Sequence, residues 1–256
     1  MLNNIPPVTK NLLIINVMLF IVSMFMLSNG IDLFELLSGR YLNSIYFEPY
    51  QVVTHMFMHS KAGLGHIFFN MFALVIFGAH LERIWGAKRF FIFYFSCGLG
   101  AFLLYNGIGV FQLYQLKNEI LSSNLLQLHG FNNFAEFHAR IMENTDLGLA
   151  YTPEFLGSTL SSYQELNSSS IVGASGAIFG LLAGFVILFP NTEMNLLFIP
   201  IPIKAKYLIG GYIAYEVYNS IYTSGDHIAH IAHVGGAIVG AAFVLFWRKR
   251  DGTNFY

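Results

Sequence analysis

Six long apolar stretches, separated by short polar segments, dominate the pattern of the chain. They cover about residues 11–28, 64–81, 90–112, 171–190, 205–222 and 228–247. Each is close to the length that a helix needs to cross the hydrocarbon core of a bilayer, about 20 residues at 1.5 Å per residue. The pattern therefore predicts an all-α membrane protein, a six-transmembrane-helix bundle formed by a single domain over residues 1–256.

The composition agrees with this pattern. Hydrophobic residues make up 55% of the chain and charged residues only 11%, whereas soluble domains carry about 25% charge. The 26 Phe and 14 Tyr residues are typical of a protein with aromatic side chains at the membrane interfaces. The net charge of −1 argues against a nucleic-acid partner, and the single cysteine, Cys97, cannot form an intrachain disulfide.

The distribution of positive charge predicts the orientation. With the N-terminus inside, nine Lys and Arg residues fall on the cytoplasmic side: Lys10, Arg83, Lys88, Arg89, Lys204, Lys206, Arg248, Lys249 and Arg250. Only four fall outside: Arg40, Lys61, Lys117 and Arg140. Because cytoplasmic loops carry the excess of positive charge, we expect a multi-pass protein of a bacterial-type cytoplasmic (inner) membrane with both termini cytoplasmic. The first stretch lacks a small-residue cleavage site after it, so we interpret it as a retained span.

Residues 113–170 depart from the compact plan. This polar segment contains six acidic and two basic residues and would form an extracytoplasmic insertion between helices 3 and 4. Residues 132–143 are typical of a short amphipathic helix, and Ser168-Ser169-Ser170 would cap the fourth span. We identify no catalytic motif in the insertion, and its role stays open between screening or recruiting substrates and passive elaboration.

A serine at the start of the fourth span is the first candidate for chemistry. Ser175 lies in Gly173-Ala174-Ser175-Gly176, where small neighbours leave its hydroxyl uncrowded and backbone N–H groups can face an oxyanion. The same region also reads as a packing surface, because Gly176, Gly180 and Gly184 recur every four residues. Taken alone, the motif favours packing.

The sixth span supplies a partner for this serine. His233, Gly236 and Gly240 share one helical face, which can bring the histidine against the glycine stripe of the fourth span. Ser175 would then be a nucleophile with His233 as its general base. In the second span His66 and Asn70 also share a face, and both can donate hydrogen bonds to an oxyanion or, alternatively, between helices.

Depth connects these side chains. The second, fourth and sixth spans all run inward, and His66, Ser175 and His233 lie roughly 5–10 Å below the outer boundary at 1.5 Å per residue. Such a depth allows water to enter from outside while a peptide is held beside lipid. The agreement in depth and face favours an active site over independent packing residues.

At this point the chain resembles the rhomboid family of intramembrane serine proteases. The resemblance covers most of the chain apart from 113–170 and is carried by these motifs: Gly173-x-Ser175-Gly176, His233-x-x-Gly236-x-x-x-Gly240, His66-x-x-x-Asn70, the run from Thr54 through Phe57 to His59, and Glu82-Arg83-x-x-Gly86. Two features depart from the family. Tyr50-Gln51 stands where a Trp-Arg pair is common, which puts the usual support of that loop in doubt, and the insertion is long.

The resemblance implies a Ser-His dyad in which Ser175 attacks the scissile carbonyl and His233 accepts its proton. The Ser175 backbone amide, His66 and Asn70 would form the oxyanion hole, and Phe179 would stack on His233 in place of the family's frequent Tyr. It also implies substrates that are transmembrane proteins, cut near the outer membrane boundary. No cofactor and no metal are expected, and the oligomeric state is left open.

Three other interpretations are compatible with parts of the sequence. A catalytically inactive relative would bind membrane clients, although Ser175 and His233 are both present. A metal-dependent hydrolase could use His227, His230 and His233, or His55 and His59, but no His is followed by Glu as in H-E-x-x-H. A transporter would need a polar path through the bilayer, for which Glu216 is the main candidate. The sequence assigns no role to Glu216, His227 or His230.

Overall fold

The computed structural model of the protein describes residues 4–61, 63–123, 125–128, 130–143, 154–196, 199–222 and 227–251. The chain divides into two compact units. Unit 1 comprises residues 1–39, 48–105 and 171–256, and unit 2 comprises residues 40–47 and 106–170. The predicted all-α character is confirmed, since most of the described residues are helical.

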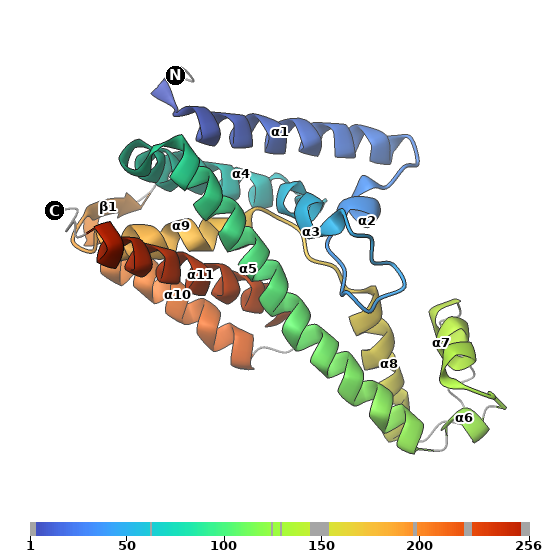
Figure 1. Ribbon diagram of the computed structural model, residues 1–256. Helices are drawn as coiled ribbons and strands as arrows, with labels where there is room; N and C mark the ends of the chain where they lie inside the picture. Colours follow the sequence, from blue (N-terminus) through green and yellow to red (C-terminus); the bar gives the residue numbers. More distant parts are fainter. Residues whose placement is uncertain are drawn as a thin grey trace. The chain divides into compact units, whose positions relative to one another are not determined.

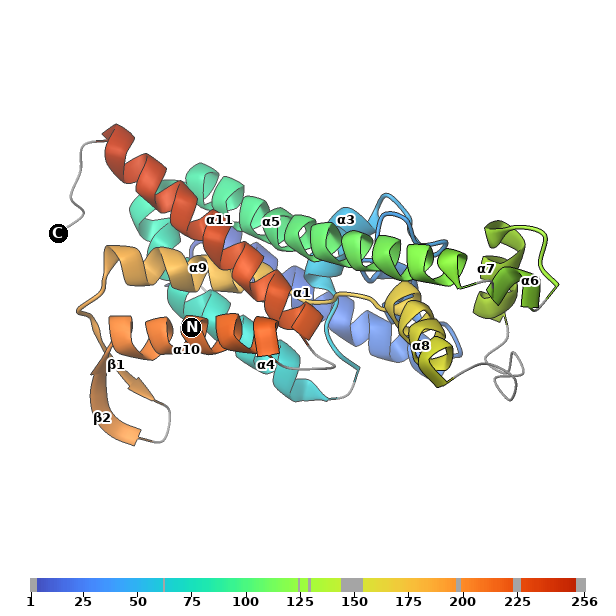
Figure 2. The same cartoon turned by 90° about the horizontal axis from the view of Figure 1, so that it is seen from below.

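Figure 1 and Figure 2 show the order of the elements. In chain order they are α1 (Pro7–Ser28), α2 (Leu33–Leu37), α3 (Gln51–Thr54), η2 (His55–Phe57), α4 (Leu64–Ala73), the π-helical segment η3 (Leu74–Gly78), α5 (Ala79–Ser122), α6 (Leu125–Leu128), α7 (Phe134–Glu143), α8 (Glu154–Ser168), α9 (Ser175–Leu188), β1 (Glu193–Leu196), β2 (Ile199–Lys204), α10 (Ala205–Tyr222) and α11 (His227–Asp251). The strands β1 and β2 form an antiparallel hairpin between α9 and α10.

Three helical segments of the described chain are long and apolar enough to cross a membrane. They are Pro7–Ser28, Leu64–Ser122 and His230–Asp251, and the shorter helix Ser175–Leu188 is also apolar. Large apolar side chains of α1 such as Met18, Ile21 and Phe25 are exposed, which suits contact with lipid. These helices are those of an integral membrane protein, while the count of six spans stays a prediction.

The turn that was expected between the second and third spans is a sharp break at Gly86. Gly86 has φ 77° and ψ 163°, a conformation that glycine adopts readily, and it interrupts the helical run that begins at Leu64. The buried carboxylate of Glu82 accepts hydrogen bonds from the backbone N–H groups of Val8 and Thr9 at 2.9 and 2.8 Å and from the Thr9 hydroxyl. Glu82 thus satisfies amides that the first turn of α1 leaves unpaired.

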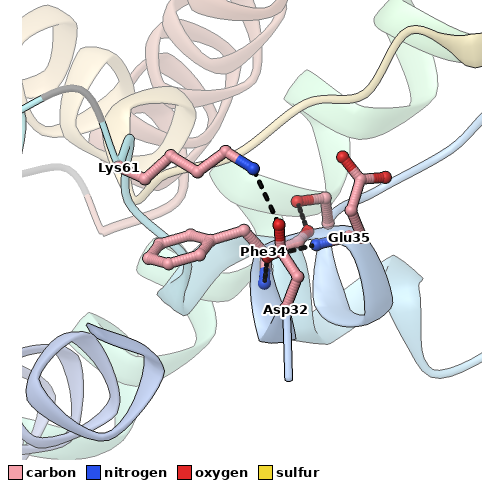
Figure 3. Close-up of polar contacts among 5 residues, drawn as sticks. Asp32, Phe34, Glu35 and Lys61 are labelled. Atoms are coloured by element: carbon pink, nitrogen blue, oxygen red, sulfur yellow. Dashed lines mark hydrogen bonds and ion pairs between the residues drawn. The ribbon is translucent and has the colours of Figure 1, made fainter. Parts of the chain in front are cut away.

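The loop after α1 is held by a short capped helix (Figure 3). Asp32 caps α2 by accepting hydrogen bonds from the backbone N–H groups of Phe34 and Glu35 at 2.9 and 3.2 Å. The Lys61 ammonium lies 2.7 Å from the Asp32 carboxylate and, as the largest effect, lowers the pKa of Asp32. The contact fixes the residues before α4 against those after α1.

Gln51 supplies support to this loop at the position where the family often carries Arg. Its side chain is buried, donates to the Leu36 carbonyl at 3.2 Å and accepts from the Glu48 backbone N–H at 3.2 Å. The loop is therefore supported at this position although Tyr50-Gln51 replaces the Trp-Arg pair, because the uncharged Gln51 amide connects α3 to the end of α2.

Two glycine stripes bring α9 and α11 together, as predicted. A Cβ built on Gly236 would lie 1.8 Å from the Gly176 carbonyl oxygen, and one built on Gly240 would lie 2.5 Å from that of Gly180. No side chain fits between the backbones at these crossings. Figure 1 and Figure 2 show α9 beside α11, with α10 next to both.

Unit 2 contains the segment 113–170, and the limits of the insertion stay a prediction. The helix α5 continues to Ser122, about ten residues beyond the end expected at 112, and α7 confirms the helix expected within 132–143. Side chains buried within this unit include Ile120, Phe137 and Tyr163. The predicted capping role of Ser168-Ser169-Ser170 is wrong: Ser168 ends α8, and α9 begins only at Ser175 because residues 171–174 are held in an extended loop.

Candidate active site

The loop before α9 is pinned by backbone hydrogen bonds on both sides. Gly39 and Ile171 exchange two N–H···O=C bonds of 2.9 and 2.8 Å, and the Gly173 N–H donates to the His55 carbonyl at 2.8 Å. Gly173 has φ +117°, and a Cβ there would lie 2.9 Å from the His66 ring. The chain then turns into α9 with Ser175 as its first residue, where unpaired amides and the helix dipole favour negative charge.

His66 faces this loop with a defined tautomer. Its Nδ1 accepts a hydrogen bond from the Ser60 backbone N–H at 3.0 Å, so the neutral ring carries its proton on Nε2. That edge of the ring points at Gly173, since a Cβ on Gly173 would meet His66 Cε1 at 2.9 Å and Nε2 at 3.2 Å, with Ser175 Oγ at 3.5 Å. His66 therefore presents a donor beside the serine hydroxyl.

Asn70 lies one turn further along α4 and is buried. Its amide nitrogen donates to the His66 carbonyl at 2.8 Å. An amide nitrogen carries two hydrogens, so this bond fixes the rotamer and leaves a second N–H for another acceptor.

His233 is held on two sides. The Phe179 ring stacks face to face on it, with centroids 4.3 Å apart and an interplanar angle of 13°. Its Nδ1 lies 2.8 Å from Oε2 of Glu216 in α10, and the same oxygen lies 2.6 Å from Nδ1 of His230. Sequence reasoning did not connect Glu216 to His233, because the two residues lie on different helices, 17 positions apart.

One cavity of about 700 Å³ brings the predicted residues together. Its walls come mainly from α4, α9 and α10, with His233 contributed by α11, and Ser175, His66 and Asn70 also line it. Most of the remaining lining side chains are apolar or aromatic, among them Phe69 and Tyr212. Ligand sites usually have such a lining, in which a few polar groups lie among mostly apolar and aromatic side chains.

The described residues contain no hydrogen bond from the Ser175 hydroxyl to His233, so the structure gives a shared cavity rather than a formed dyad. Such pairs are often loose when no substrate is bound. Gly176, Gly236 and Gly240 lie at the crossing of α9 and α11 that sets the distance between the two residues. The side chain of His227 lies outside the described residues.

The histidine and glutamate cluster also tests the metal interpretation. Glu216, His230 and His233 place three ligand-type atoms within 4.8 Å of one another. Two ligands of one tetrahedral zinc ion would lie about 3.3 Å apart at metal–ligand distances of about 2.0–2.1 Å. The observed N···O separations of 2.6 and 2.8 Å are shorter and match hydrogen bonds.

A family model, the Rhomboid domain, matches residues 46–112 and 131–250 of the chain. The gap between the two blocks, 113–130, is the first part of the predicted insertion. The matched blocks contain His66, Asn70, Ser175 and His233, and they cover more than half of the chain.

Two relatives are similar to the chain. The rhomboid protease AarA of Providencia stuartii is 27% identical over 206 residues, which are 78% of this chain and 57% of AarA. A mitochondrial rhomboid protein of Schizosaccharomyces pombe, described as uncharacterised, is 35% identical over 91 residues, which are 33% of this chain and 23% of that protein. The chain thus spans only part of the length of each of these relatives.

Proposed function

The chain belongs to the rhomboid family, and from this premise we propose that it is an intramembrane serine endopeptidase acting through Ser175 and His233. The single observation that carries the proposal is the cavity that Ser175, His233, His66 and Asn70 line together. Four polar residues from three helices converge there, in a protein whose membrane-facing helices otherwise present apolar side chains. Polar groups at membrane depth are costly and tend to be functional.

In the proposed first step, Ser175 Oγ bonds to the scissile carbonyl carbon while its proton moves to His233 Nε2. The tetrahedral intermediate then collapses: the C–N bond breaks, and His233 gives the proton to the leaving amine. Water next attacks the acyl ester, and its proton returns through His233 to Ser175. Each proton is thereby accounted for by one base, without a cofactor or metal.

The developing oxyanion would be held by three donors. These are the Ser175 backbone N–H at the start of α9, the Nε2–H of His66 and the second amide hydrogen of Asn70. Because the His66 and Asn70 side chains are fixed by hydrogen bonds of their own before substrate arrives, little reorganisation of these two donors is needed in the transition state. Removal of one oxyanion donor in other hydrolases costs about 10²–10³ in kcat.

We further propose that the substrates are transmembrane proteins, cut near the outer membrane boundary. Phe69 of α4 and Tyr212 of α10 line the cavity and are 62% and 46% exposed. Apolar, accessible rims of this kind suit a peptide that arrives from lipid. From the resemblance to the family we expect cleavage at small residues.

The experiment that tests the function is reaction of the purified protein with a fluorophosphonate probe, alongside cleavage of a single-span substrate. We expect the wild-type protein to be labelled and to cleave, and the Ser175→Ala and His233→Ala forms to do neither. The probe requires an activated serine, so labelling of the wild-type protein also excludes an inactive protein that only binds membrane clients.

Unchanged cleavage by Ser175→Ala would overturn the serine mechanism. Cleavage that a chelator abolishes and zinc restores would favour a metal-dependent hydrolase instead. A folded wild-type protein that binds the substrate without labelling or cleavage would indicate the client-binding alternative.

A further inference from the structure

We propose that Glu216 is a positioning residue for the catalytic histidine, so that this chain works with a Ser175–His233–Glu216 triad rather than with the serine and histidine alone. The inference rests on the proposed function, because it assigns Glu216 a role only through His233. It starts from one contact, the 2.8 Å separation of Glu216 Oε2 and His233 Nδ1.

That contact determines which nitrogen of His233 carries the proton. An ionised carboxylate can only accept hydrogen bonds, so Nδ1 of His233 must be the donor. The neutral ring then has its lone pair on Nε2, the nitrogen that can take the serine proton. The alternative tautomer, with the proton on Nε2, could not act as the base.

The environment of Glu216 favours this single arrangement. Its side chain is buried, with a residue exposure of 3%, and a buried carboxylate is costly unless hydrogen-bonded. His230 Nδ1 donates to the same Oε2 atom at 2.6 Å, so two donors fix the position of one oxygen. Phe179 stacks on the face of the His233 ring and so restrains the orientation of the ring from a second side.

During the reaction the Glu216 carboxylate would have a second effect, on the charge of His233. When His233 takes the proton from Ser175 it becomes a cation, and an anion 2.8 Å from its Nδ1 stabilises that charge within a partly desolvated site. Glu216 touches neither substrate nor serine in this account. Its effect therefore belongs in kcat, not in the affinity for substrate.

The test compares Glu216→Gln with Glu82→Gln in the full-length protein in detergent. Both variants exchange a buried, hydrogen-bonded carboxylate for an amide, but Glu82 caps α1 far from His233 in sequence and contacts Val8 and Thr9 instead. We expect Glu216→Gln to lower kcat at least about tenfold with KM within about threefold of wild type. Glu82→Gln should lower the thermal midpoint and leave kcat per folded molecule unchanged.

Glu216→Asp supplies the rescue arm. It keeps the carboxylate on a shorter side chain, so kcat should recover partly relative to Glu216→Gln. If the kcat of Glu216→Gln stays within about threefold of wild type, the positioning role of Glu216 is overturned. The Ser175→Ala variant still reports separately on the serine mechanism. Equal losses in Glu216→Gln and Glu82→Gln would likewise reduce Glu216 to a structural residue.

A second measurement needs no variant of Glu216 and covers the case in which Glu216→Gln does not fold. The tautomer of His233 in the wild-type protein can be read from ¹⁵N-histidine NMR at neutral pH, with the resonance assigned by its loss in His233→Ala. We expect a protonated Nδ1 and an unprotonated Nε2. The opposite tautomer would overturn the proposal, whether or not the protein proves to be a protease.

Discussion

At the scale of single residues, the candidate site depends on two histidines with opposite tautomers. His66 Nδ1 accepts from the Ser60 backbone, which leaves a proton on Nε2, whereas His233 Nδ1 donates to Glu216, which leaves a lone pair on Nε2. One ring thus offers a donor and the other an acceptor at the same cavity. Exchanging the hydrogen-bond partners of either ring would remove its proposed role without changing the residue.

The residues of the site were predictable to different degrees. Ser175, His233, His66 and Asn70 stand out in the sequence because each is a polar residue within or beside an apolar stretch and shares a local spacing with other small or polar residues. Glu216 stands out equally as a charge in a span, but its partner lies on the next helix. No periodicity within one helix encodes that contact, so only the packing of α10 against α11 reveals it.

Buried neutral histidines in the loop before α4 predict a loss of stability in acid. Burial lowers the pKa of His59 to about 4, from an ordinary value of 6.5. The stabilisation is complete above pH 6.5 and is lost as the pH falls towards 4, because the unfolded chain binds the proton first. The His59→Phe variant, which cannot titrate, should lose about 3 kcal/mol less stability than wild type between pH 7 and 4.

The measurement is the thermal midpoint of both proteins in detergent at several pH values. His55 is a second buried histidine of this loop, with a pKa also lowered to about 4 by burial, so the variant should retain part of the acid sensitivity. Identical pH profiles for wild type and His59→Phe would contradict the assignment of the effect to His59.

At the scale of elements, the glycine stripes explain how two chemically unrelated helices can place Ser175 and His233 at one cavity. Close backbone approach in α-helical membrane proteins relies on small residues, since lipid provides no hydrophobic drive between helices. The stripe that by itself favoured packing over chemistry is therefore part of the site: it brings α9 and α11 together one turn from the reactive side chains.

Gly236→Ala tests this crossing. Its Cβ would lie 1.8 Å from the Gly176 carbonyl oxygen, so α9 and α11 must separate, and we expect a loss of about 1–3 kcal/mol or more together with most of the activity. Gly211→Ala in α10 is the matched control, because its Cβ would meet nothing within 4 Å and alanine favours a helix. Thermal unfolding and probe labelling report both effects; equal stability of the two variants would contradict the close crossing.

The hydrophobic pattern predicts the helices where they are long and apolar. The observed limits differ from the predicted ones where a few specific contacts determine the start or end of an element. The core of each apolar stretch is helical as predicted. The start of α9 at Ser175 could not be read from the sequence, because the extended loop before it depends on hydrogen bonds with Gly39 and His55. The continuation of α5 to Ser122 was missed because its last turns are polar, and the β1–β2 hairpin was not anticipated at all.

At the scale of the molecule, contacts within unit 1 tie both ends of the described chain to the turn around Gly86. The Arg83 guanidinium donates to the Asn4 carbonyl at 2.6 Å, and Arg89 forms an ion pair with Asp251 at 2.6 Å. The start of α1 and the end of α11 therefore lie at the same end of this unit, as an even number of spans requires. Most of the positive charges assigned to the cytoplasm belong to this end.

If this end faces the cytoplasm, the loop that contains Glu48 must face outward, and the orientation can be tested with introduced cysteines. Glu48 and Lys88 are both exposed, whereas the native Cys97 is fully buried and should stay silent towards a membrane-impermeant maleimide. We expect Glu48→Cys to be labelled in intact cells and Lys88→Cys only after permeabilisation, with the wild-type chain unlabelled in both. The reverse pattern would invert the positive-inside assignment and move the proposed site, together with its supply of water, to the cytoplasmic side of the membrane.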